Sequence, residues 1–147
     1  MPVEEIGMRE LKGLKGLGCV GNVSHDVAEQ ERRGQKGPSW FVGHFQPDGD
    51  PRKIDTFEVS VSSQFEGWRR GKWGGQKTAW TFSYVVSGVL QVDFEEESVV
   101  LRAGDYVHYG PGVVHHIEVL KDAVWLSCRG PSVSGDSFKL DYSVREV

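Results

Sequence analysis

Residues 104–116 read Gly-Asp-Tyr-Val-His-Tyr-Gly-Pro-Gly-Val-Val-His-His, and this stretch decides the fold. It combines a Gly-Asp turn, a short apolar strand, a Gly-Pro-Gly turn and a histidine at the start of another strand. Side chains alternate between the two faces of a strand, so neighbouring histidines point in opposite directions. We therefore expect His115 to face the interior and His116 to face solvent.

The sequence from residue 40 onward is typical of many short β-strands. Segments rich in β-branched and aromatic residues alternate with turns such as Ser87-Gly88 and Lys121-Asp122, and no helical period lies between them. This pattern predicts an all-β protein, either a closed barrel or a two-sheet sandwich. The expected strands cover residues 40–45, 56–61, 78–86, 89–94, 99–101, 106–109, 115–120 and 124–128.

The first 37 residues differ in composition from the rest. We expect residues 1–37 to form a short helical or loop extension and residues 38–147 to form the barrel domain. Leu11, Leu14 and Leu17 have helical spacing, so a short helix is expected within residues 2–17. Residues 24–38 are polar and charged, which predicts an exposed loop or a frayed helix.

Composition excludes several classes of protein. The chain has 147 residues, enough for one domain with a proper core, and a net charge of -4, which gives no reason to expect nucleic acid. No apolar run is long enough to span a membrane, and the first residues lack the features of a secretory signal. Two cysteines do not make a disulfide framework. A cytoplasmic location is expected.

The stretch that ends at His115 resembles the second conserved motif of the cupin superfamily. That motif runs Gly, five residues, Pro, one residue, Gly, two residues, His, and Gly104, Gly112 and His115 fit it, with the proline displaced by one place to Pro111. Residues 84–92 look like the end of the first cupin motif, with its closing glycine at Gly88. The resemblance implies a cupin double-stranded β-helix, or jelly-roll barrel.

The first motif lacks the metal ligands that the resemblance implies. Counting back from Gly88 places the family's glutamate at Thr81 and its two histidines within residues 74–77, which read Gly-Gly-Gln-Lys. Of the three histidines and one glutamate, only His115 remains, whereas a mononuclear site needs about three strong ligands. We expect no cofactor. The alternative is a divalent metal in a rebuilt site made by His115, His44 and His108.

A pocket without metal can still perform acid–base chemistry, and some cupin-like epimerases use a histidine and a tyrosine in this way. Histidine is suited to proton transfer near neutral pH, and a tyrosine can return the proton from the opposite face. The candidate catalytic residues are His115, His44, Tyr84 and Tyr106. Tyr109 is a further candidate acid, although strand tyrosines more often pack than react.

Aromatic and cationic residues cluster before and within the degenerate first motif. Trp68, Trp73 and Trp80 alternate with arginines and lysines, a combination that suits a planar or anionic organic ligand. The alternative is a surface hairpin whose tryptophans pack the core. The candidate substrate-binding residues are Glu58, Gln64, Trp73, Trp80 and His108.

Three functions remain open. The first is a metal-independent cupin enzyme of the isomerase, epimerase, cyclase or lyase type acting on a small organic molecule. The second is a non-catalytic cupin that binds a small ligand, and the third is a metal-dependent, dioxygenase-like cupin. The resemblance also implies a homodimer, which would cover exposed sheet edges.

Overall fold

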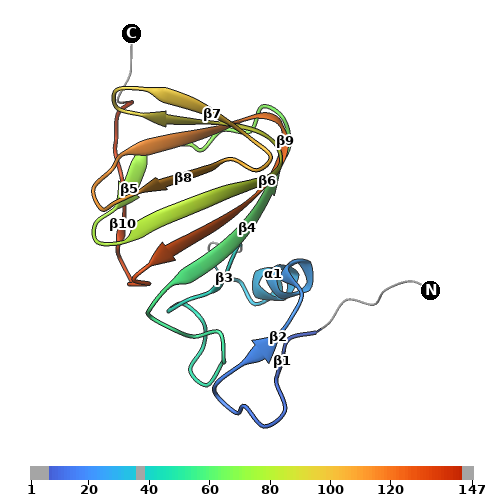
Figure 1. The fold of residues 1–147 in the computed structure, drawn as a ribbon. Helices are drawn as coiled ribbons and strands as arrows, with labels where there is room; N and C mark the ends of the chain where they lie inside the picture. The colour runs from blue at the N-terminus through green and yellow to red at the C-terminus, as the bar shows by residue number, and fades with distance from the viewer. Residues whose placement is uncertain (1–6, 36–38, 144–147) are drawn as a thin grey trace, which may run out of the picture.

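The computed structural model describes residues 7–35 and 39–143 and consists mostly of β-strands. A curled antiparallel sheet forms the larger part, and helix α1 lies at one end of it beside β3 and β4 (Figure 1). The predicted all-β cupin fold is confirmed. The elements are β1 Arg9–Glu10, β2 Cys19–Val20, α1 Val23–Arg32, β3 Trp40–Val42, β4 Glu58–Gln64, β5 Gly74–Gln76, β6 Trp80–Phe94, β7 Ser98–Arg102, β8 Tyr106–Tyr109, β9 His115–Gly130 and β10 Ser137–Lys139.

Two long strands, β6 and β9, hold the sheet together. The first half of β6 pairs with β8 and with the second half of β9, and its second half pairs with β7 and with the first half of β9. Strand β4 extends the second half of β9 and β5 extends its first half, so β3 and β10 form edges. The core packs between the two halves and consists of Val85, Leu90, Val92, Leu101, Val119, Ala123 and Trp125.

Strands β6 and β9 continue where the sequence predicted turns. The register between them shifts around Ser87 and Val89, and Gly88 has a positive φ of 81°. A Cβ atom at Gly88 would lie 2.0 Å from the carbonyl oxygen of Asp122 on the facing strand. The glycine therefore permits a close approach and a sharp bend in two continuous strands, so four of the predicted strands are halves of β6 and β9.

The N-terminal predictions were partly wrong. Residues 9–10 and 19–20 pair as a small hairpin, in place of the helix expected within residues 2–17, of which residues 2–6 lie outside the described part. Helix α1 forms where a loop or frayed helix was expected. Asn22 caps it by accepting a hydrogen bond from the backbone N–H of His25 at 3.1 Å. Asp26 and Gln30 are buried, so the helix packs on its polar side.

Short strands β5 and β10 were not predicted, because Gly-Gly-Gln and Ser-Phe-Lys carry no strand signal of their own. The predicted domain boundary at residue 37 lies outside the described residues. No helix in the described part of the chain combines the length and apolarity needed to cross a membrane.

Candidate functional site in the barrel interior

The inner face of the sheet changes from apolar to polar along its length. Thr81, Ser83 and Val85 are buried on β6, while the alternate residues Trp80, Phe82 and Tyr84 are exposed on the other face. Ser83 Oγ lies 2.8 Å from Ser127 Oγ across the strand pair. Buried hydroxyls that face inward create an interior that can accommodate charged groups.

His115 lies at the start of β9 in this polar part and is only 4% exposed. Arg70 donates a hydrogen bond from Nη1 to Nε2 of His115 at 2.8 Å, and the hydroxyl of Tyr109 lies 3.0 Å from the same nitrogen. Nδ1 of His115 is 3.5 Å from the carbonyl oxygen of Val113. These contacts fit a neutral ring with its proton on Nδ1 and its lone pair on Nε2.

Burial and charge hold His115 in that neutral form. Burial first, and then the positive charge of Arg70, lower the pKa of His115 to about 3. Burial raises the pKa of Tyr109 to about 12, although the charges of Arg70 and Arg129 oppose this change. Because His115 is a weak base whose lone pair already accepts a hydrogen bond, the cluster is better suited to binding than to taking up a proton.

A second polar cluster brings together His44 and Glu58. The side chain of Glu58 forms an ion pair with Arg129 through Oε1, and its Oε2 accepts a hydrogen bond from Ser132 Oγ at 2.9 Å. Nδ1 of His44 is 2.6 Å from Ser132 Oγ and 3.6 Å from Glu58 Oε2. Since the hydroxyl of Ser132 donates its hydrogen bond to Glu58, it accepts a hydrogen bond from the N–H at Nδ1 of His44, which leaves the lone pair of His44 on Nε2.

A cavity of about 330 Å³ opens beside this cluster. The side chain of His44 remains 30% exposed, whereas Glu58 is buried behind it. The guanidinium of Arg129 lies 3.9 Å from the ring centroid of Trp40, a cation–π contact that fixes its plane. The walls are formed by Trp40, His44, Phe45, Glu58, Gln76, Arg129, Val133, Gly135, Asp136 and Ser137.

Four predicted site residues lie on the other face of the sheet. Tyr84, Tyr106, Trp80 and His108 are exposed and point away from the interior that holds His115. The correction follows from strand alternation, because Val107 and Tyr109 are the inward residues of β8. His108 therefore cannot meet His115 and His44, and the predicted rebuilt metal site of these three histidines does not form.

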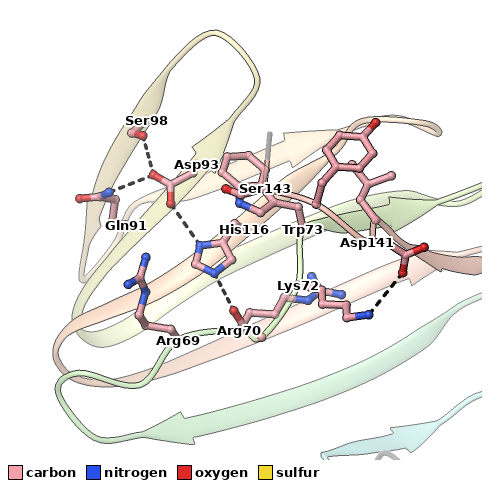
Figure 2. A pocket seen from close by; sticks show the side chains of 13 residues that line it. Arg69, Arg70, Lys72, Trp73, Gln91, Asp93, Ser98, His116, Asp141 and Ser143 are labelled. Atoms are coloured by element: carbon pink, nitrogen blue, oxygen red, sulfur yellow. Dashed lines mark hydrogen bonds and ion pairs between the residues drawn. The ribbon is translucent and has the colours of Figure 1, made fainter. Parts of the chain in front are cut away.

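Gln64 and Trp73 lie apart from His44. Gln64 ends β4 and lines a cavity beside α1. Trp73 is buried against His116, with their ring centroids 5.6 Å apart and nearly parallel, in a pocket of about 740 Å³ (Figure 2). The prediction that His116 faces solvent was wrong, since it is only 5% exposed. In Figure 2 dashed lines join its ring to Asp93 on one side and to Arg70 on the other.

A family model described as "Cupin domain" matches residues 70–128 of this chain. These residues therefore match a cupin domain, and the fold of the sheet is cupin-like. A protein with a double-stranded β-helix domain from Klebsiella pneumoniae is similar, with 18% identity, coverage of 60% of this chain and 78% of the other, and a TM-score of 0.54. Streptomyces Pac13 with uridine has 18% identity, with coverage of 60% of this chain and 72% of the other and a TM-score of 0.53. A cupin from Bacteroides fragilis has 19% identity, with coverage of 64% of this chain and 81% of the other and a TM-score of 0.50.

At these identities the likeness concerns the fold. Pac13 is described as a nucleoside dehydratase. The comparison with functionally curated proteins found no match.

The residues of this cupin do not fit the divalent metal of the family. Gly74 pairs with His115, but a Cβ atom at Gly74 would lie 2.3 Å from the carbonyl oxygen of Phe138. A Cβ atom at Gly75 would lie 2.5 Å from the carbonyl oxygen of Val113. The backbone thus leaves no room for ligand side chains here. Among the described residues, no three His, Cys, Asp or Glu side chains gather as a metal site.

The structure adds three residues that sequence reasoning did not single out. Arg70 was seen only as one cation of a basic segment, and Arg129 and Ser132 carried no motif. Their positions depend on register, since Glu58 lies opposite Arg129 in the β4–β9 pairing. The alternation of β9 could have indicated Arg129, which shares the parity of Trp125 and Ser127.

Proposed function

We propose that this cupin binds a small organic anion in the cavity beside His44 and transfers a proton on it, as an isomerase- or lyase-type enzyme. The observation that carries the proposal is the tether on His44. Its Nδ1 lies 2.6 Å from Ser132 Oγ, which in turn donates to Glu58. A carboxylate behind a histidine orients the ring and stabilises the protonated imidazole, which is the arrangement a general base requires.

Arg129 supplies the binding charge in this proposal. Its Nε donates to Glu58, and the planar fork of the guanidinium leaves further N–H groups for a ligand at the cavity. Hydrogen bonds from a guanidinium to a carboxylate or phosphate are about twice as strong as neutral ones. A ligand anion held there would lie beside the imidazole of His44.

The chemistry is the removal of a proton from a carbon next to a carbonyl group. Nε2 of His44 takes the proton, and the electron pair of the C–H bond moves onto the carbonyl oxygen as an enolate. Return of the proton to the other face of the same carbon gives an epimer. Departure of a β-hydroxyl group, which takes the proton from Nε2 of His44 and leaves as water, gives a dehydrated product. Each outcome balances without an added oxidant or reductant.

Deuterium exchange tests the proposal. The protein is incubated in deuterium oxide with a panel of 2-oxo acids and uronates, and proton NMR follows the C–H signal beside the carbonyl. We expect exchange with at least one probe and a loss of about 100-fold or more in His44→Gln. His25→Gln is the matched control, because His25 lies in α1 away from the cavity.

Binding of a probe without exchange would leave the alternative, a non-catalytic ligand-binding cupin. Wild-type protein that neither binds nor exchanges any probe would contradict the proposed function.

We also infer a homodimer, formed through the outer face of the sheet. Two rows of residues cross β8, β6, β9 and β4 on this face, and neither contains Asp, Glu, Lys or Arg. A large uncharged aromatic patch usually marks an interface, and a surface without charge can face its own copy. The rows are His108-Phe82-Cys128-Val59 and Tyr106-Tyr84-Leu126-Val61.

Sedimentation equilibrium tests this interface. Phe82→Lys places a charge in the middle of one row and should convert the dimer to a monomer. Val100→Lys is the control, because Val100 is an exposed apolar residue on β7, outside these rows. A wild-type monomer at high protein concentration would overturn the inference.

A further inference from the structure

We propose that the guanidinium of Arg70 is the resident cation of this barrel, in place of a metal ion, and that it holds an anionic oxygen of the ligand beside His115 and Tyr109. The inference rests on the proposed function, because the anion is that of the ligand bound near Arg129. It adds a second binding residue and a reason why the family's metal ligands are absent from β5.

The first step is the place that Arg70 occupies. His115 is the one histidine that matches the cupin ligand pattern, and its Nε2 accepts a hydrogen bond from Arg70 at 2.8 Å. A nitrogen whose lone pair points at a guanidinium cannot also point at a metal ion. Beside it, the backbone carbonyls of Phe138 and Val113 close the space at Gly74 and Gly75. The same local structure therefore excludes one cation and installs another.

The second step is the charge balance of the interior. Arg129 is paired with Glu58, and Asp136 accepts hydrogen bonds from the N–H groups of Thr78 and Ala79. Within the described ranges, 7–35 and 39–143, no carboxylate lies within ion-pair distance of Arg70. Its hydrogen-bond partner, His115, is neutral. Arg70 is half-buried, and a half-buried cation without a counter-charge is unfavourable, so an incoming anion would remove that penalty.

The third step is the relation between the two arginines. Burial lowers the pKa of Arg70, and the nearby charge of Arg129 acts in the same direction. Tyr109, whose hydroxyl lies 3.0 Å from Nε2 of His115, is in register with Thr81, and Thr81 is in register with Arg129, so the two clusters lie on one inner face. A carboxylate near both guanidinium groups would relieve their repulsion. Arg70 has five N–H groups, of which Nη1 is engaged by His115.

Carboxylate binding provides the main test. The probes are pyruvate and malonate, with propionamide as a neutral match, and binding is followed by NMR titration of the protein. We expect Arg70→Ala to weaken binding of the carboxylates by about 10- to 100-fold, the range for a lost charge-assisted hydrogen bond. Arg70→Lys keeps the positive charge but not the planar guanidinium, so its affinity for the carboxylates should lie between those of the wild type and Arg70→Ala. Methylguanidinium added to Arg70→Ala should restore part of the binding.

Arg69→Ala is the matched control. Arg69 is the neighbouring arginine, its side chain is exposed, and it lies beside Glu118 on the outer face. The Arg69→Ala variant should bind the two carboxylates with the same affinity as the wild type. The Arg70→Lys variant also guards against a folding defect in Arg70→Ala.

Three outcomes decide the matter. Carboxylate binding that depends on Arg129 but not on Arg70 would overturn the inference and leave the proposed function standing. Wild-type protein that binds neither carboxylate would overturn both. Equilibrium dialysis against zinc, manganese and nickel should show no stoichiometric metal in the wild type. A 1:1 metal that is lost in His115→Ala would overturn the inference even if carboxylates bind.

Discussion

His115 and His116 are neighbours in the chain and both are buried, yet they lie in opposite electrostatic surroundings. His115 faces the interior, where a cation donates to its Nε2. His116 faces the other side, where Nδ1 is 3.2 Å from Asp93 Oδ2 and Nε2 is 2.6 Å from the carbonyl oxygen of Arg70. The first ring accepts a hydrogen bond from a cation, whereas both nitrogens of the second ring face hydrogen-bond acceptors. One residue, Arg70, contacts both rings with different ends.

The difference shows that strand alternation determines the face of the sheet on which a side chain lies, but not whether other segments bury that face. The outer face at His116 is covered by residues 69–73 and by the C-terminal segment near Leu140, which line the pocket of Figure 2. The two ring nitrogens of His116 both lie within hydrogen-bond distance of acceptors, the carboxylate of Asp93 and the carbonyl oxygen of Arg70. Trp73 stacks on this ring and shields the pair from water.

The largest expected effect comes from breaking the pair on the outer face. His116→Ala leaves the buried carboxylate of Asp93 without its imidazole partner, although Ser98 and Gln91 still donate to it. We expect a loss of about 3 kcal/mol in the free energy of unfolding, measured by urea denaturation, as for other broken buried pairs. His25→Ala, at a histidine of α1 whose side chain is 44% exposed and which lies outside the proposed interface, should change it by less than about 0.5 kcal/mol. Equal losses in both variants would show that the pair does not stabilise the fold.

A second effect separates the two histidines by pH. The folded pKa of His115 is about 3, below its ordinary 6.5. Protonation therefore favours the unfolded chain, so this stability is complete above pH 6.5 and is lost as the pH falls toward 3. At pH 5 the loss is about 2 kcal/mol. Urea unfolding of wild type and His115→Gln between pH 7 and 4.5 should show this loss in the wild type only.

The contribution of Asp93 to stability depends on pH in a lower range than that of His115. Burial raises its pKa, but hydrogen bonds from Ser98, Gln91 and His116 outweigh this and lower it below 3.8. A lowered carboxyl pKa gives stability that is present above the unfolded value and is lost only as the pH falls through the folded one. Asp93 therefore does not mask the effect of His115. If the free energy of unfolding of the wild type did not change between pH 6.5 and 4.5, this would contradict the buried, neutral state of His115.

His115 and His116 also show which features of the structure could be predicted from the sequence. The turn glycines and strand patterns predicted the fold, and alternation placed His115 inside. The predicted exposure of His116 was wrong because the residues that bury it are distant in the chain, and no local sequence pattern encodes the path of those segments. The pairing of His44 with Glu58 depends on Ser132, which is 88 residues from His44. Tyr84 and Tyr106 were preferred over Tyr109 because the sequence alone does not show which face of β8 is inward.

The smallest effect tests the inner cluster through Tyr109. Tyr109→Phe removes the hydroxyl that lies 3.0 Å from Nε2 of His115 and keeps the ring, which packs edge-on against Phe94 at 5.5 Å between centroids. We expect a loss of about 1 kcal/mol in the free energy of unfolding, the usual contribution of one hydrogen bond. Tyr142→Phe is the control, because Tyr142 is 67% exposed and lies outside the proposed interface. Since Arg70 still donates to Nε2, His115 should stay neutral in Tyr109→Phe, and its ring signals in NMR should not titrate between pH 5 and 8. A titrating ring would mean that Tyr109, and not Arg70, sets the state of His115, and the contrast between the two histidines would then rest on a tyrosine.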